Sequence, residues 1–332
     1  MTSYPIWISE QDVVSLMSLP DAIASLERGL ALQASGDARN MVKTHVAWGD
    51  NNLHAIGATI PGCGLVGTKT WAHTTGGTCP LLVLFDSESG QLKAIIEAFA
   101  LGQMRTGGIS GVATQWLSRL DADVLALIGT GKQALAQIAA VAAVRPLRQA
   151  RVFSPTAEKR RAFVGSARET FDIEIVEASS VEEATKDAPI ITTVTRAKQP
   201  FLPASNIAPG AHINAVGAIT EERLELNDDV FGRCTRAVVD DLPAAQKLSM
   251  ELIRTYGKAQ RWAEIASLCD VVAGRRERNA SDDITVFKAM GMGISDLALG
   301  AEILARAVDA GRGIALPSPA RKAPRLSRDG RQ

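Results

Sequence analysis

The sequence predicts an α/β fold whose central part is a doubly wound, mainly parallel sheet. Short apolar segments alternate with helical segments between residues 124 and 216, which is the pattern of successive strand–helix units. A turn that contains two glycines joins the first apolar segment to a helix. The chain has 332 residues and is 46% hydrophobic, which suits two separate cores.

The glycine turn has the spacing of a dinucleotide-binding loop. An unbroken apolar run at 124–128 leads directly into Gly129-Thr-Gly131-Lys-Gln-Ala134. In such a loop Gly129 permits the sharp turn, Gly131 lets the backbone approach a pyrophosphate, and Ala134 allows close helix packing. The phosphates would lie at the helix N-terminus, where free N–H groups favour negative charge. Ordinary turns also show this spacing, but a second apolar segment at 150–153 follows at the interval expected of a Rossmann domain.

The residues before this loop predict a separate, smaller domain. Amphipathic helices are expected at 8–17, which carries a serine cap signal, and at 19–32. Residues 41–85 are rich in strand formers with turn-like breaks, and 80–98 predict a hairpin. Because these strands precede the dinucleotide loop, we expect them to form their own sheet.

Residues 100–120 predict a helix rich in small residues. Each internal glycine costs about 0.5–1 kcal/mol relative to alanine, so this helix is expected to pack closely against a ligand or another helix. The strand–helix alternation of the central domain then continues, with helices expected at 133–144, 157–170 and 180–186, and strands at 150–153, 173–176, 189–194 and 211–216. Further units are expected at 236–240, 271–274 and 284–288, followed by a helix at 295–310 and a disordered tail at 317–332.

Composition excludes several classes of protein. Lys plus Arg and Asp plus Glu are equal at 36 each, so no basic excess is available for nucleic acid. No apolar run reaches the ~18 residues of a membrane span, and no signal peptide is apparent, so we expect a cytoplasmic location. The four cysteines and four histidines lack metal-ligand spacing, which predicts no metal site.

The second nucleotide-binding strand indicates which cofactor is preferred. A site selective for NAD places an acidic residue at the end of this strand, where it binds the ribose hydroxyls. Here the strand ends in Phe153-Ser154-Pro-Thr156 without an acid, and Lys159-Arg-Arg follows. We therefore expect NADPH, with NADH possible. Lys159 and Arg160 are equally explained as a solvated helix face.

Three cations in the front half of the chain are candidate substrate ligands. Lys43 and Lys69 lie on predicted strands and Arg105 lies on the glycine-rich helix. If they converge they form a carboxylate clamp, although each alone is explained as a surface residue. His73 is a possible proton donor, but a histidine beside an aromatic residue is more often structural. His212 is expected to position a loop.

The motifs together resemble the ornithine cyclodeaminase/μ-crystallin family over nearly the whole chain. The resemblance rests on five segments in order: Gly67-Thr-Lys-Thr, Arg105-Thr-Gly-Gly-Ile-Ser-Gly-Val-Ala, Gly129-Thr-Gly-Lys-Gln-Ala, Gly210-Ala-His-Ile-Asn-Ala-Val-Gly217 and Thr285-Val-Phe-Lys-Ala-Met-Gly-Met-Gly-Ile-Ser-Asp-Leu297. It implies a homodimer and a substrate-binding and dimerisation domain made of 1–120 with 298–316. The Rossmann domain would then span 121–297.

The resemblance also assigns roles to residues. It implies that Lys69 and Arg105 contact the substrate and that Asp296 takes part in catalysis, while His73 and Lys43 are further substrate-binding candidates. Lys43 stands where the family usually has an arginine, and lysine lacks the same bidentate fork. With the loop argument above, the expected cofactor-binding residues are Gly129, Thr130, Gly131, Lys132, Gln133, Ser154, Thr156, Lys159, Thr195, Val216, Gly217 and Ile294.

One departure from the family pattern bears on the reaction. Cyclodeaminases carry an aspartate shortly after Ala-Val-Gly, and this chain has Ile219 there. The resemblance then favours a reductase of 2-imino acids, which are cyclic ketimines such as Δ1-pyrroline-2-carboxylate and Δ1-piperideine-2-carboxylate or imines of 2-oxo acids, giving L-amino acids such as proline. Lys69 would donate a proton, or Asp296 would orient a water that does. The alternatives are ornithine cyclodeaminase, an alanine-dehydrogenase-like enzyme and a non-catalytic NADPH-binding protein.

Overall fold

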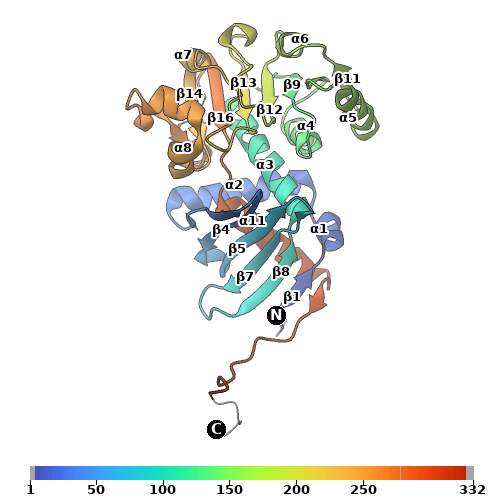
Figure 1. Ribbon diagram of the computed structural model, residues 1–332, viewed down its shortest axis with the longest axis vertical. Coiled ribbons are helices and arrows are strands. Elements are labelled where there is room, and N and C mark those ends of the chain that lie inside the picture. Colours follow the sequence, from blue (N-terminus) through green and yellow to red (C-terminus); the bar gives the residue numbers. More distant parts are fainter. Residues whose placement is uncertain (1–3, 277, 327–332) are drawn as a thin grey trace.

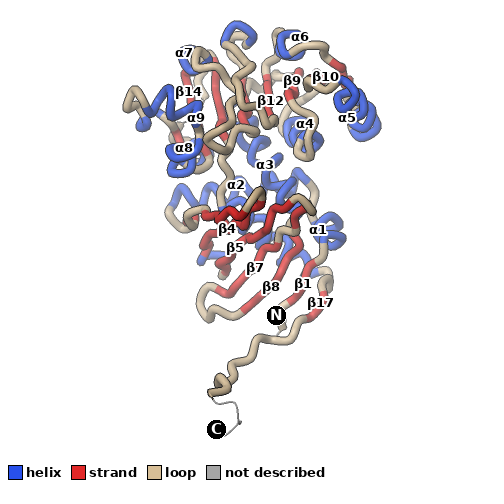
Figure 2. The backbone as a smooth tube through the Cα atoms, viewed as in Figure 1, coloured by secondary structure: helices blue, strands red, loops and turns tan. Residues whose placement is uncertain are grey.

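The computed structural model describes residues 4–276 and 278–326, which form two sheets connected by a long helix (Figure 1 and Figure 2). The first sheet has the strand order β17-β1-β8-β7-β5-β4-β2, with β3 paired to β4 and β6 paired to β5. Its strands are β1 (Ile6–Ile8), β2 (Arg39–Asn40), β3 (Thr44–Trp48), β4 (Asn51–Ile60), β5 (Leu65–Thr74), β6 (Gly77–Thr78), β7 (Leu81–Asp86), β8 (Leu92–Glu97) and β17 (Ile314–Ala315).

Helices α1 (Glu10–Leu16) and α11 (Gly293–Asp309) pack on this sheet, and α2 (Leu19–Ser35) packs on α11. Ser9 and Ser18 begin α1 and α2 with capping boxes, each exchanging hydrogen bonds with the aspartate three residues later. Helix α11 packs closely because a Cβ at Gly300 would lie 2.4 Å from Leu82 Cδ2. The last helix of the chain therefore belongs spatially to the first sheet.

The two faces of the first sheet differ because its side chains alternate. Leu65, Leu82, Leu84 and Ile96 point inward and are buried. Their neighbours on the outer face remain partly exposed, and this outer set includes Val66, Val83, Phe85 and Ile95. Four further apolar residues on or beside β3 and β4 are exposed, namely Val42, Val46, Trp48 and Leu53.

The second sheet is wholly parallel, with the order β11-β10-β9-β12-β13-β16-β14-β15. Its strands are β9 (Val124–Ile128), β10 (Gln149–Phe153), β11 (Glu174–Glu177), β12 (Ile190–Thr193), β13 (His212–Ala215), β14 (Cys234–Val239), β15 (Ala266–Ser267) and β16 (Ile284–Lys288). The helices of this Rossmann-like domain are α4 (Ala134–Ala142), α5 (Ala157–Thr170), α6 (Val181–Thr185), α7 (Val230–Arg233), α8 (Leu242–Leu248), α9 (Met250–Leu252) and α10 (Leu268–Val272). Short helical turns are η1 (Pro61–Cys63), η2 (Ala204–Asn206), η3 (Ile253–Gly257) and η4 (Trp262–Glu264).

Helix α3 (Phe99–Leu117) runs from the first sheet to the second and packs as its small residues predict. A Cβ at Gly107 would lie 2.7 Å from the carbonyl oxygen of Ala136, and one at Gly108 would lie 2.7 Å from Leu26 Cδ1. Its far end is fixed to the parallel sheet, because Asn214 on β13 donates to Thr114 Oγ1 at 2.9 Å. The helix thus holds both domains in one arrangement.

The short elements β2, β15, β17, α7, α8 and α9 were not expected from the sequence, and two further differences are informative. Strand β1 was not expected, since its three residues are too few to show a period. Residues 271–274 were expected to be a strand unit, but they end the short helix α10 and continue into a turn. Leu268 and Val271 are buried there at the three-residue spacing of a helix. The adjacent valines Val271 and Val272 are too short a segment to distinguish the helical period from the two-residue period of a strand.

The C-terminal residues were predicted to form a tail. Residues 317–326 are exposed and form no helix or strand, and 327–332 lie outside the described residues. No helix within 4–276 and 278–326 has both the length and the apolar character needed to cross a membrane.

Candidate active site

A buried lysine–carboxylate pair lies where the first sheet meets the N-terminus of α11. Lys69 on β5 donates from Nζ to Oδ1 of Asp296, which is in the first turn of α11. Their side chains are only 4% and 1% exposed. Burial lowers the pKa of Lys69 to about 8, against the opposing effect of Asp296. The pKa of this ammonium group is therefore close to the range in which it can exchange protons near neutral pH.

Glycines allow this close approach of helix and sheet. A Cβ at Gly293 of α11 would lie 1.8 Å from the carbonyl oxygen of Gly57, and a Cβ at Gly67 would lie 3.4 Å from Leu297 Cδ1 of the same helix. Asn40 fixes the start of the helix, because its Oδ1 accepts a hydrogen bond from Ile294 N at 2.9 Å. Asp296 is consequently held over Lys69 by backbone packing. Ile294, predicted to lie near the cofactor, is buried beside this contact.

Arg105 on α3 approaches the same carboxylate from the other side. Its Nε is 3.6 Å from Asp296 Oδ1, and its side chain is 20% exposed. A Cβ at Gly291 would lie 2.9 Å from an Arg105 terminal nitrogen, and Gly291 has a φ of +82°. Since Gly291 follows β16, Arg105 reaches the carboxyl edge of the parallel sheet. Lys69 and Arg105, predicted as substrate ligands, therefore meet at one carboxylate.

Lys43 is half-buried just before β3 and contributes a third positive charge to this region. Burial, followed by the charge of Arg105, lowers its pKa, while Asp240, Asp296 and Asp241 act in the opposite direction. Within the described part of the chain, Lys43 forms no salt bridge within 4.0 Å. It is thus a free cation beside the paired ones.

Asp240 and Asp241 follow β14 and have different roles. Asp240 is 2% exposed and accepts hydrogen bonds from Met290 N at 2.7 Å and Gly291 N at 2.8 Å. Asp241 caps α8 by accepting from Ala244 N at 2.9 Å. Their side chains diverge, and Asp240 fixes the loop against which Arg105 lies. Sequence reasoning did not predict that contact.

An aromatic wall continues from Lys69 along the sheet. Lys69 Nζ lies 5.3 Å from the centroid of the Trp71 ring, and His54 stacks on Trp71 at 4.8 Å. His45 stacks on His54 at 5.6 Å, while burial, and then Lys43, lower the pKa of His54. His73, the predicted substrate ligand, is exposed at the far end of β5. Sequence reasoning missed His54, whose cross-strand pairing with Trp71 was the available signal.

The predicted dinucleotide loop lies at the carboxyl end of β9. Gly129 has a φ of +117°, and a Cβ there would lie 2.7 Å from the Val194 carbonyl oxygen. A Cβ at Gly131 would have no heavy atom within 4 Å, so the loop has open space above it. Gln133 precedes α4 without a side-chain cap, and Lys132 Nζ lies 5.7 Å from the Phe99 ring centroid. These features leave helix N–H groups available to an anion.

The end of β10 holds the residues predicted to select the cofactor. Ser154 is buried, and its Oγ accepts a hydrogen bond from Thr130 Oγ1 at 3.1 Å. Thr156 and Lys159 are exposed at the start of α5. Arg160 is already engaged, because it pairs with Glu177 at 2.9 Å and donates to the Ser154 carbonyl oxygen at 2.6 Å. Lys159 is therefore the freer of these two cations.

Thr195, Val216 and Gly217 lie where β12 and β13 end, at the same sheet edge as Gly291. Val216 is buried, and a Cβ at Gly217 would lie 2.2 Å from the Thr195 carbonyl oxygen. Both Thr195 N and Gly217 N donate to the carboxylate of Glu225. His212 at the start of β13 is fully buried and bonds to Thr285 and Asn214, so its role is to hold strands together.

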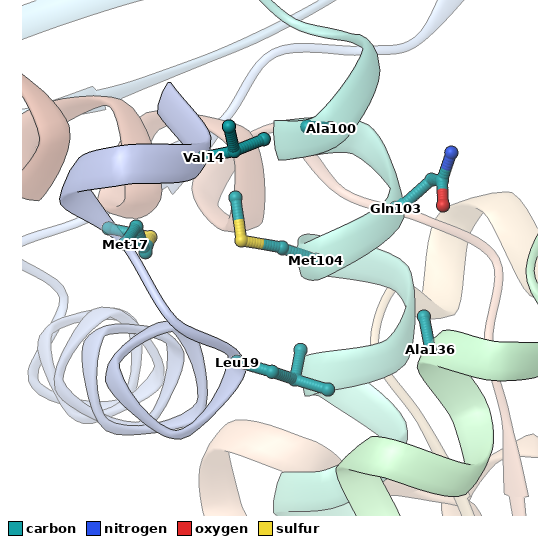
Figure 3. Close-up of a pocket in the computed structure, with 7 residues that line it drawn as sticks. All are labelled: Val14, Met17, Leu19, Ala100, Gln103, Met104 and Ala136. Carbon is teal, nitrogen blue, oxygen red and sulfur yellow. The ribbon is translucent and has the colours of Figure 1, made fainter. Parts of the chain in front are cut away.

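A separate cavity of about 250 Å³ lies between α1, the start of α2, α3 and α4 (Figure 3). None of its lining residues is ionisable, and they are Val14, Met17, Leu19, Ala100, Gln103, Met104 and Ala136. It therefore cannot supply acid–base chemistry. The convergence of charged groups lies instead around Asp296.

The parallel sheet and its glycine loop make this a two-domain Rossmann-like protein, and the buried cations face the carboxyl edge of that sheet. Comparison with known proteins specifies the class further. The chain belongs to the ornithine cyclodeaminase/mu-crystallin family, whose model matches residues 5–311.

Three similar proteins illustrate the relationship. The chain is 32% identical over 236 residues to Delta(1)-pyrroline-2-carboxylate reductase of Bacillus cereus, which covers 70% of this chain and 72% of that one. The structure of the Thermococcus litoralis enzyme of the same name, in complex with NADH and L-proline, superposes with a TM-score of 0.88 at 26% identity, covering 94% of this chain and 100% of that one. The structure of an archaeal alanine dehydrogenase dimer with bound NAD superposes with a TM-score of 0.86 at 25% identity, covering 94% of this chain and 99% of that one.

Proposed function

We propose that this protein is an NAD(P)H-dependent oxidoreductase that reduces the C=N bond of 2-imino acids to give L-amino acids. The observation that carries the proposal is that Lys69 and Arg105, from different elements, converge on Asp296 at the carboxyl edge of the parallel sheet. The names of its relatives, two of which are Delta(1)-pyrroline-2-carboxylate reductases, support the same reaction type. Cyclic ketimines are the substrate class we propose first.

The substrate carboxylate would be held by Arg105 with help from Lys43. Arg105 can offer a bidentate fork, and Lys43 supplies a charge that no carboxylate of the described residues neutralises within 4.0 Å. Two ligands from different directions fix the orientation of the imine carbon, which is a large source of rate enhancement. The flat wall of Trp71 and His54 would lie beside the substrate side chain or ring.

Proton delivery to the imine nitrogen would come from Lys69. Hydride addition to the carbon and proton addition to the nitrogen convert C=N to CH–NH. Because burial lowers the pKa of Lys69 to about 8, its ammonium group can lose a proton more readily than an exposed lysine. Asp296 holds this ammonium in place, and it would also orient a water if the proton arrived that way.

A nicotinamide cofactor fits the residues at the sheet edge. When bound in its reduced form, it supplies the hydride. Gly129 permits the tight turn against Val194 and Gly131 leaves room for a pyrophosphate, while the N-terminus of α4 offers free N–H groups, with Thr130, Lys132 and Gln133 in the same loop. Ser154, Thr156 and Lys159 would contact the adenosine ribose and favour NADPH. Thr195, Val216, Gly217 and Ile294 would surround the other half of the cofactor.

The domains would divide this work, with 1–120 and 298–316 binding substrate and 121–297 binding the cofactor. The outer face of the first sheet supports a homodimer, because Val66, Val83 and Phe85 leave an apolar row that continues to exposed Val46 and Trp48. The archaeal alanine dehydrogenase, similar in fold, is a dimer. We propose that a second copy covers this face.

The decisive experiment supplies the purified protein with NADPH or NADH and a set of substrates. Δ1-Pyrroline-2-carboxylate and Δ1-piperideine-2-carboxylate should be reduced, with oxidation of the cofactor and formation of L-proline and L-pipecolate. Pyruvate with ammonia tests the alanine dehydrogenase alternative, and ornithine with NAD tests cyclodeamination. Cofactor binding without any turnover would instead indicate the non-catalytic alternative.

A further inference from the structure

A completely buried carboxylate, Glu225, lies between the loops that follow β12 and β13 and has no place in the chemistry above. It is 0% exposed and accepts four hydrogen bonds. Its Oε1 accepts from Thr195 N at 2.6 Å. Its Oε2 accepts from Thr193 Oγ1 at 3.0 Å, Gly217 N at 2.9 Å and Ala218 N at 3.2 Å.

The two loops are in direct backbone contact at this point. A Cβ at Gly217 would lie 2.2 Å from the Thr195 carbonyl oxygen and 2.4 Å from Glu225 Oε1. The two loop N–H groups, from Thr195 and Gly217, therefore point at one carboxylate instead of at each other. Both loops leave the sheet at its carboxyl edge, the side to which Arg105 and Gly291 also come. The Glu225 carboxylate thus sets their spacing.

A second buried carboxylate holds Glu225 itself. Glu251 Oε1 accepts from Glu225 N at 2.7 Å and from Leu226 N at 2.9 Å. Glu251 Oε2 pairs with Lys288 Nζ at 2.8 Å, and both side chains are 1% exposed or less. Since Lys288 ends β16, the chain of contacts joins the ends of three neighbouring strands. This arrangement is fully internal to the Rossmann-like domain.

We propose that Glu225 is a positioning residue that fixes the Thr195 and Gly217 backbones to receive the nicotinamide half of the cofactor. This inference rests on the proposed cofactor binding. A carboxylate accepts all four hydrogen bonds with its two oxygens, whereas glutamine offers one oxygen and an NH₂ group that donates. Replacing Glu225 with glutamine would set its NH₂ group against at least one loop N–H group, such as that of Thr195, and the loops would have to shift.

The test compares ligands that contain or lack the nicotinamide. ADP-ribose and its 2′-phosphate occupy only the half of the site at the Gly129 loop, whereas NADH and NADPH occupy both halves. In Glu225→Gln, the dissociation constant of the reduced dinucleotide should rise by about tenfold or more, as expected for lost hydrogen bonds. The dissociation constant of ADP-ribose should change by only about twofold, since Glu225 makes no direct contact with the Gly129 loop and adjoins it only through Thr195. Calorimetry measures both without any turnover.

Glu222→Gln is the matched control. It removes the same charge from the same loop, but Glu222 is 59% exposed and pairs with Lys198 at the surface. It should bind all four ligands as the wild type does. Thr193→Val is the second variant, because it removes one donor to Glu225 and keeps the carboxylate. It should weaken dinucleotide binding by a few-fold, and it decides the question if Glu225→Gln does not fold.

Two results would overturn the inference. If the variants weaken the binding of ADP-ribose and of the dinucleotide equally, Glu225 only stabilises the domain. If dinucleotide binding is unchanged in a folded Glu225→Gln variant or in Thr193→Val, the loops need no such support. A wild-type protein that binds neither NADH nor NADPH would instead refute the proposed function. The two failures are therefore distinguishable.

Discussion

Among the described residues, two lysine–carboxylate pairs are buried, and their surroundings are very different. Lys69 and Asp296 join the first sheet to α11, and Lys288 and Glu251 join strands inside the Rossmann-like domain. Around Glu251, backbone N–H groups satisfy the second oxygen. Around Asp296, Arg105 approaches the paired oxygen at 3.6 Å and the other oxygen has no hydrogen-bond partner among the described residues.

The difference supports the proposal that the pair at Lys69 is the one that takes part in the reaction. Burial and pairing are common to both sites, so neither feature identifies chemistry by itself. The pair at Lys69 has extra cations beside it, Arg105 and Lys43, and an oxygen left to bind something else. The pair at Lys288 adjoins another buried carboxylate, Glu225, and its Lys288 Nζ and Glu251 Oε2 face each other at 2.8 Å without a hydrogen bond to any other described residue. Matched substitutions at the two lysines can therefore separate an effect on turnover from an effect on the stability of the fold.

The largest expected effect is on turnover in Lys69→Met. Loss of the proposed proton donor should lower kcat for imine reduction by about 10²–10⁴-fold. Binding of NADPH should change by less than about twofold, because Lys69 lies in the other domain. Steady-state kinetics and calorimetry measure the two quantities, and normal imine reduction by this variant would exclude the proposed role of Lys69.

The corresponding change in the other pair, Lys288→Met, should act on stability. It leaves Glu251 charged and without its partner in a site that is 0% exposed, at a cost of about 3–5 kcal/mol. Chemical denaturation should show a smaller loss for Lys69→Met, since Arg105 remains near Asp296. Equal destabilisation by the two variants would contradict the distinction drawn between the pairs.

The pH dependence should also reveal Lys69. Its pKa is lowered from 10.5 to about 8, so it is protonated below about pH 8 and neutral above it. If its proton is used, kcat for imine reduction should be flat below pH 8 and fall about tenfold per pH unit above it. Between pH 8 and 10.5 the unfolded chain binds more protons at this lysine, so its contribution to the free energy of unfolding should rise with pH. A profile unchanged up to pH 10 would contradict the assignment.

The smallest expected effect concerns Lys43, the free cation beside the pair. Lys43→Arg introduces a bidentate fork and should lower KM for the imino acid by about two- to fivefold. Lys43→Met should raise KM with little change in kcat, since it removes a binding contact rather than the proton donor. Substrate-saturation curves for both variants test this, and an unchanged KM in both would remove Lys43 from the site.

Most of the fold could be predicted because its signals are local. The apolar run before Gly129 and the turn between the two strands of the 80–98 hairpin each specify an element within about ten residues. The exceptions, such as β1 and α10, are too short to show a period. Strand β1 forms because it can pair with β8 and β17, which are distant in sequence.

The candidate site was only partly predictable. Lys69 and Arg105 stand in motifs, but nothing local to Glu225 or Glu251 distinguishes them from surface acids. The donors to these two carboxylates come from segments 7 to 32 residues away, so their burial depends on how separate loops pack together. Sequence reasoning therefore passed over both residues.

The sequence by itself determined the order of strands and helices, the glycine loop and the family, since each depends on residue types at fixed spacing. Only the tertiary structure decided which charges meet. Lys69 and Asp296 are 227 positions apart, and the pair exists because α11 returns to the first sheet and begins where Gly57 gives it room. The strength of a charge depends on its burial and its neighbours, and long-range packing sets both.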